Sequence, residues 1–274
     1  MPPLSEISYS RDDCVSAVRE YYNFLVGMYV DEAEVVEPPP GGWPNITTAT
    51  MAALGKTDEV VSLLRHLPYL RRNKNDMYNV QPAAWCYFAN WEANARGMIR
   101  DRTMGESYRV TTEGAPLYEI LPPHVVSLTQ GGRDNPVFLI DTELGIGLWH
   151  ECPGEVKHDP SREAIEDDAY DYEEDEEQAE WRGDSGAWSI PDFFEILKDQ
   201  FRELQFIPKN PRLVVDVYTR YGRDCDGMIE MLQGIYREHG WPDMEKYRKK
   251  DCLKALQKAL KERYPRHADL IEEE

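Results

Sequence analysis

Two histidines and a cysteine near the middle of the chain have the residue types of a metal site. His150 and Cys152 are two residues apart, so on a β-strand their side chains would point to the same side, and a loop could return His158 to them. Imidazole nitrogen and thiolate sulfur are preferred Zn²⁺ ligands, and three protein ligands leave one position open. We therefore treat His150, Cys152 and His158 as a candidate zinc site. The alternative is a hairpin end that carries ordinary polar residues.

Other residues of chemical interest are better explained by structure. Cys86 stands among aromatic residues, which predicts a buried, inert thiol rather than a nucleophile. Asp224, Asp226 and Gly227 lack the remaining ligands of a calcium loop and predict a turn before a helix. HExxH, GxSxG and P-loop motifs do not occur in the chain. The sequence therefore assigns no catalytic residue.

Acidic residues are concentrated in one segment. The formal net charge is -20, and between Glu163 and Glu180 there are eleven acidic residues and no Lys or Arg. This composition predicts a disordered or loosely held surface loop that aids solubility. Embedded aromatic residues favour a second interpretation, in which the loop contacts a partner protein with a basic surface, such as a histone. The candidate contact residues are Tyr170, Asp171, Tyr172, Glu173, Glu174, Asp175 and Trp181. In a third interpretation the segment is an autoinhibitory arm that folds onto a basic C-terminal helix.

The fold prediction is centred on residues 137–150. Two apolar runs, Val137 to Ile140 and Ile146 to Trp149, flank a short polar turn, a pattern that predicts a β-hairpin. Both runs are nearly continuous in apolar character, so we expect both faces of the strands to be covered. The predicted class is α+β, with a largely antiparallel sheet centred on this hairpin, packed with helices, and a helical C-terminal extension.

Capping residues and apolar periodicity place the other elements. Predicted helices run from Ser10 to about Tyr29, 47–54, 57–67, from the cap Ser189 onward, 227–239 and 243–264. Predicted strands are 85–88, 107–112, 125–128 and, as an edge strand, 213–218. We expect one main domain over 1–205, with an acidic loop at 160–182, and a C-terminal extension over 206–274 packed on it.

Composition limits the expected location and partners. The chain begins without the basic and apolar regions of a signal peptide, and it has no apolar run long enough to span a bilayer. Its five cysteines include no CxxC pair, which indicates a reducing compartment. We expect a cytoplasmic protein, with the nucleus as a further location. Nucleic acids and anionic membranes are disfavoured as partners because both are polyanions.

The order of these elements resembles the SUKH superfamily, which includes fungal cell-wall synthesis regulators and bacterial toxin-immunity proteins. The resemblance covers about residues 11–205 and is carried by the YYNFL motif at 21–25, the turn at 131–132, the hairpin and the segment 187–197. It implies a largely antiparallel sheet against helices, and a module that acts by protein–protein contact without shared catalytic residues. The acidic insertion and the tail from about 206 depart from the pattern.

The whole chain also resembles a group of filamentous-fungal proteins. This likeness is carried by the segments 54–59, 131–137 and 238–242, and it implies no activity.

The favoured functional hypothesis is a non-enzymatic protein–protein interaction or regulatory module of the cytosol. One alternative is a metal-dependent enzyme, with zinc as its cofactor and a pocket at the end of the central hairpin. A second alternative is an acidic chaperone-like binder of a basic client protein, for which salt-sensitive binding is the expected signature.

Overall fold

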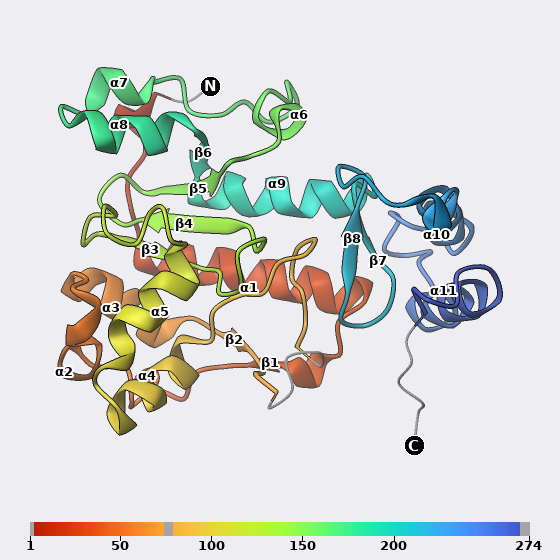
Figure 1. Cartoon of the computed structure of the whole chain (residues 1–274), viewed down its shortest axis with the longest axis horizontal. Helices are drawn as coiled ribbons and strands as arrows, with labels where there is room; N and C mark the ends of the chain where they lie inside the picture. The colour runs from red at the N-terminus through yellow and green to blue at the C-terminus, as the bar shows by residue number, and fades with distance from the viewer. Residues whose placement is uncertain (1–2, 74–78, 269–274) are drawn as a thin grey trace.

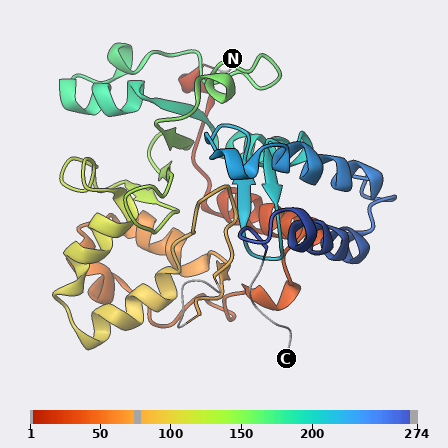
Figure 2. The same cartoon turned by 45° about the vertical axis from the view of Figure 1, so that its right-hand side comes forward.

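The computed structural model describes residues 3–73 and 79–268, and they form an α+β fold (Figure 1 and Figure 2). The helices are α1 (Arg11–Met28), α2 (Thr48–Met51), α3 (Asp58–His66), α4 (Trp91–Arg100), α5 (Met104–Glu113), α6 (Gly154–Lys157), α7 (Ala169–Tyr172), α8 (Glu176–Gly183), α9 (Ile190–Arg202), α10 (Met228–Glu238) and α11 (Lys249–Arg263). Single 3-10 turns are η1 (Leu4–Glu6), η2 (Glu32–Glu34), η3 (Ala52–Leu54) and η5 (Arg223–Cys225). The strands are β1 (Val35–Val36), β2 (Tyr69–Leu70), β3 (Val125–Ser127), β4 (Val137–Asp141), β5 (Ile146–His150), β6 (Ser185–Ser189), β7 (Phe206–Pro208) and β8 (Val214–Asp216).

The main sheet has the strand order β3-β4-β5-β6, and every neighbouring pair is antiparallel. β4 and β5 form the predicted hairpin and lie in the middle of the sheet, with Leu139 paired to Leu148. Gly145 takes a positive φ in the turn, where a Cβ would meet the backbone of Ser8 at 2.7 Å. The class and the central hairpin predicted from the sequence are therefore confirmed.

Both faces of the sheet are covered, as the continuous apolar runs predict. Phe138, Ile140 and Trp149 point to the face on which α1 and α9 pack, and Phe138 meets Phe193 of α9 edge to face at 5.6 Å. Leu139 and Leu148 point to the other face and form a second apolar cluster. In Figure 1 α7 and α8 lie on the side of β5 away from α1. The sheet is thus the middle layer of three.

Local sequence signals explain the helices that pack on the first face. Ser10 caps α1 by accepting a hydrogen bond from the amide of Asp13, and Ser189 caps α9 in the same way with Asp192. Pro191 occupies the first turn of α9, where a missing N–H costs nothing. Both helices begin where the caps predict.

Several sequence predictions of local structure are wrong. Residues 107–112, predicted as a strand, belong to α5, and residues 85–88 form a turn with isolated bridges because Trp85 takes a φ of 56°. The helix predicted over 243–264 begins only at Lys249, since residues before it form turns.

The C-terminal elements share the main core. Tyr236 of α10 is fully buried and donates a hydrogen bond to the carbonyl of Pro208, and Leu256 and Leu260 of α11 belong to the same cluster of buried side chains as Phe201. β8 lies within the predicted edge strand and pairs with β7. The predicted division of the chain at 205/206 remains a prediction. Within the described residues, no helix is long and apolar enough to cross a membrane.

Candidate functional site

The acidic segment is folded, which corrects the prediction of a disordered or loosely held loop. It contains α7 and α8, and its own carboxylates start both helices: Asp168 accepts a hydrogen bond from the amide of Tyr170, and Asp175 accepts one from Gln178. Glu176 and Glu177 occupy the first turn of α8, where negative charge is favourable to the helix dipole. A high content of acidic residues usually disfavours a compact chain. In this segment several of them lie at the starts of helices, where their negative charge is favourable.

Apolar residues within the segment attach it to the sheet. Trp181 is 3% exposed and packs with Leu148 and Ala187 in the second apolar cluster. The amide of Ile165 donates a hydrogen bond of 3.0 Å to the carbonyl of Ala187, so the chain runs beside β6 there. Gln178 links its side-chain amide to the carbonyl of Ile120 at 2.8 Å. The segment is therefore the cover of the sheet's second face.

A buried ion pair reinforces this attachment. Arg182 Nη2 lies 2.7 Å from Asp141 Oδ2, and both side chains are almost completely buried. Arg182 Nε lies 2.8 Å from Glu173 Oε1, and the guanidinium stacks on Trp181 with 4.5 Å to the ring centroid. Asp141 also accepts hydrogen bonds from the amides of Glu143 and Leu144 in the hairpin turn. Arg182 of α8 thus connects this helix to the central hairpin and to Glu173, the residue that follows α7.

Other side chains of the segment are exposed to solvent. We call this surface the acidic platform; it consists of the exposed carboxylates and one exposed ring, namely Glu166, Asp168, Tyr170, Asp171, Glu174, Asp175, Glu176, Glu177 and Glu180. Tyr170 is 60% exposed, which is unusual for a large aromatic side chain in this protein. Between Arg162 and Arg182 the sequence has no basic residue to neutralise these charges. The platform is a folded surface of high negative charge.

The predicted contact residues divide into two groups. Tyr170, Asp171, Glu174 and Asp175 lie on the platform, as a contact role requires. Tyr172 and Glu173 are half-buried, and the prediction for Trp181 needs correction because its ring is buried on the sheet. Arg182 and Asp141 are not among the contact residues predicted from the sequence. The sequence does contain a signal for Arg182, since it is the first basic residue after the acidic run and directly follows Trp181.

The interpretation of the segment as an arm on the basic C-terminal helix is also wrong. Figure 2 places α7 and α8 at the opposite end of the molecule from α11, and the same separation appears in Figure 1. The acidic segment makes its contacts with β5 and β6 instead.

The predicted zinc ligands do not converge. His150 lies at the end of β5, with Nδ1 3.5 Å from Ser185 Oγ; Cys152 is half-buried; and His158 is exposed. In the described part of the chain, the one group of three or more His, Cys, Asp or Glu side chains with ligand atoms within 4.8 Å of one another is Asp224, Cys225 and His267. Burial raises the pKa of Cys152 to about 12, and burial lowers the pKa of His150.

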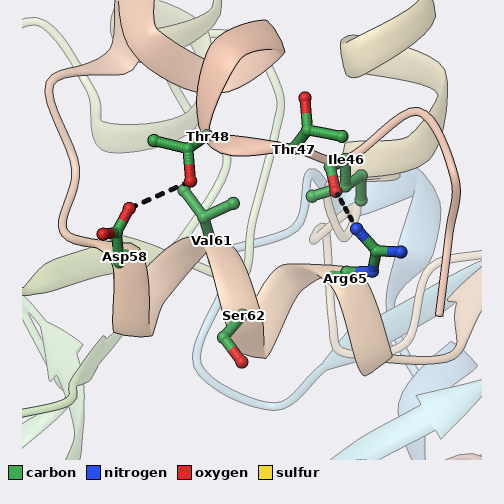
Figure 3. Close-up of a pocket in the computed structure, with 7 residues that line it drawn as sticks. All are labelled: Ile46, Thr47, Thr48, Asp58, Val61, Ser62 and Arg65. Atoms are coloured by element: carbon green, nitrogen blue, oxygen red, sulfur yellow. Dashed lines mark hydrogen bonds between the residues drawn. The ribbon is translucent and has the colours of Figure 1, made fainter. Parts of the chain in front are cut away.

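Cavities of the described residues lie elsewhere. One, of about 300 Å³, is bounded by the start of α2 and by α3 (Figure 3). Its polar groups bond to one another: Thr48 donates to Asp58 at 2.9 Å, and Arg65 donates to the carbonyls of Gly41 and Ile46. A second cavity, of about 290 Å³, includes Gln130, which bonds to Asn94 and Thr111. These polar groups of the two cavities already have partners within the fold.

Comparisons of the chain with protein-family models, with curated proteins and with solved structures find no match.

Proposed function

We propose that this protein is a non-enzymatic interaction module that binds a Lys- and Arg-rich segment of a partner protein on the acidic platform. The observation that carries the proposal is the combination of exposed carboxylates and an exposed Tyr170 on helices that Trp181 and Arg182 fix to the sheet. The resemblance to the SUKH superfamily is in keeping with it, because members of that superfamily act by protein–protein contact.

Charge and rigidity support this function in different ways. A dense carboxylate surface attracts a basic segment and accelerates its association, and it repels polyanions such as nucleic acids. Because the platform is folded before a partner binds, binding loses no free energy to the ordering of these helices. Tyr170 supplies apolar contact area within the charged surface, the usual character of an energetically important contact residue.

The test uses a labelled Lys- and Arg-rich peptide and two variants with equal loss of negative charge. In the platform variant Glu166, Glu174, Glu177 and Glu180 become Gln. In the control variant four exposed glutamates of α10, α11 and the turn between them become Gln: Glu230, Glu238, Glu245 and Glu262. Both variants avoid the helix caps Asp168 and Asp175.

We expect fluorescence anisotropy to show peptide binding to the wild type that weakens as salt is raised. Each exposed ion pair contributes roughly 0.2–1 kcal/mol, so loss of four should weaken peptide binding to the platform variant by about fourfold or more. The control variant should bind within about threefold of the wild type. Equal weakening in both variants would show that net charge, not the platform, attracts the peptide and would contradict the proposal.

A Tyr170→Ser variant separates specific recognition from attraction by charge alone. It leaves every carboxylate in place, and Tyr170 has no side-chain hydrogen bond among the described residues. We expect weaker peptide binding with unchanged thermal stability. Binding equal to that of the wild type would reduce the platform to a diffuse electrostatic surface.

A further inference from the structure

Three side chains with metal-binding atoms meet where the turn after α11 lies against the segment before α10. Cys225 Sγ lies 3.1 Å from His267 Nε2, and His267 Nε2 lies 3.7 Å from Asp224 Oδ2. Cys225 Sγ is also 3.9 Å from Asp224 Oδ1. Cys225 and His267 are 42 residues apart in sequence, so the fold and not local spacing brings them together.

Neighbouring contacts fix the two segments that carry these side chains. Cys225 ends η5, and Gly227 follows with a φ of 78°, where a Cβ would meet Tyr264 Oη at 3.3 Å. Tyr264 donates a hydrogen bond of 2.7 Å to the carbonyl of Asp226, and Lys209 donates one of 3.1 Å to the carbonyl of His267. The turn after α11 is therefore held against the start of α10 independently of the cluster itself.

The distances match those between ligands of a tetrahedral metal ion. With Zn–S near 2.3 Å and Zn–N or Zn–O near 2.0–2.2 Å, neighbouring ligand atoms stand roughly 3.4–3.6 Å apart. The observed separations of 3.1, 3.7 and 3.9 Å lie on both sides of this value. The last two end on different oxygens of Asp224, Oδ2 and Oδ1, so side-chain rotations must bring one of these oxygens to both partners. Cys225 is buried, whereas the side chains of Asp224 and His267 are 56% and 30% exposed, which leaves one side open to an entering ion.

We propose that Asp224, Cys225 and His267 form a binding site for a Zn²⁺-type divalent ion, with a fourth position open to solvent. Thiolate and imidazole ligands select zinc and similar transition metals over Ca²⁺ and Mg²⁺, which prefer oxygen ligands only. The bound ion links η5 to the turn after α11 and so closes the C-terminal elements on each other. The site is independent of the acidic platform and of the hairpin end.

Cobalt substitution tests this site, because Co²⁺ bound to a thiolate gives a charge-transfer absorption that zinc does not. The full chain, first stripped with a chelator, is titrated with Co²⁺ and then with Zn²⁺. We expect the thiolate band to saturate at one equivalent of Co²⁺, and Zn²⁺ to remove it by competition. We also expect the melting temperature to rise with Zn²⁺ concentration, because the ion binds the folded state.

Variants assign the ligands. Cys225→Ser should abolish the thiolate band, and Asp224→Asn and His267→Gln should each weaken Co²⁺ binding by more than about 100-fold, beyond the usual effect of a supporting residue. In the presence of the chelator, all three variants should have the same melting temperature as the wild type. Two of the side chains are partly exposed, and Cys225→Ser is nearly isosteric. A Cys152→Ser/His158→Gln control should keep full binding. A band that persists in Cys225→Ser, disappears in the control, or is absent from the wild type would overturn the proposal.

Discussion

Asp141 carries a charge that is fully buried beneath the acidic segment, and buried charge is stable only when it is compensated. Two backbone amides of the hairpin turn and the guanidinium of Arg182 provide that compensation. Arg182 in turn lies within 2.8 Å of Glu173, which belongs to the link between α7 and α8. These residues couple the hairpin to the platform, so the platform's order depends on them.

Arg182→Met should therefore destabilise the protein strongly. Removal of one partner from a buried pair typically costs about 3–5 kcal/mol, because the other charge stays buried without compensation. Urea unfolding should show a loss of about 3 kcal/mol, at the lower end because Asp141 keeps its two amide bonds.

Two further variants make this result interpretable. Lys246→Met removes a partner of the exposed Lys246–Asp243 pair and should change stability little. The Asp141→Asn/Arg182→Met double variant should regain part of the lost stability, since the fully buried charge of Asp141 is gone and only the partly exposed Glu173 lacks its partner. A loss in Arg182→Met no larger than that in Lys246→Met would contradict the assigned role of Arg182.

The strands and helices show how far sequence patterns reach. Two apolar runs around a short polar turn located the hairpin, and capping residues located α1 and α9, because these signals act within a few residues. The continuous apolar character of β4 and β5 also required a cover on the second face. The apolar residues that provide this cover are present in the acidic segment, but the many charged residues around them led to the prediction of a loop. They are Ile165, Ala169, Ala179 and Trp181. Apolar residues spaced within an acidic run are therefore better interpreted as one face of a folded element.

Other elements had no signal of that kind. Residues 107–112 contain β-branched residues and a tyrosine, typical of a strand, but tertiary packing against η3, α4 and β3 makes them part of α5. The cluster of Asp224, Cys225 and His267 depends on a chain return over 42 residues. No sequence spacing indicates such a return, whereas the regular spacing of His150 and Cys152 suggested a site that the fold does not assemble.

The end of β5 should make stability depend on pH. Burial, the largest effect, lowers the pKa of His150 below its ordinary value of 6.5, although the charges of Glu151 and Asp184 oppose it. The His150 imidazole therefore takes up a proton more readily in the unfolded chain than in the folded protein. Stability from this group is complete above pH 6.5 and is lost as the pH falls from there through the folded-state pKa.

A His150→Gln variant isolates this effect. Chemical denaturation between pH 8 and pH 5 should show a smaller acid-side loss of stability in the variant than in the wild type. Parallel curves for the two proteins would show that His150 titrates alike in the folded and unfolded states.

The C-terminal part of the chain packs on the N-terminal helix α1. Lys249 donates hydrogen bonds of 2.6 Å to the carbonyls of Val26 and Val30 at the end of α1, and Tyr247 donates one of 2.8 Å to the carbonyl of Met28. A cation at a helix C-terminus is favoured by the helix dipole. The helices of the acidic platform, α7 and α8, lie apart from α10 and α11, next to which the proposed metal site is built (Figure 1), so a ligand at one leaves the other accessible.

The most direct test of the central claim is amide hydrogen exchange with and without the Lys- and Arg-rich peptide. In the free protein we predict slow exchange for the amides of α8, because the helix is fixed to the sheet by Trp181 and Arg182. Peptide should slow exchange further across residues 169–183 and leave α10 and α11 unchanged. Exchange of α8 at the rate of an unstructured chain, or protection by the peptide at α10 and α11 instead, would contradict a folded acidic platform that binds a basic partner.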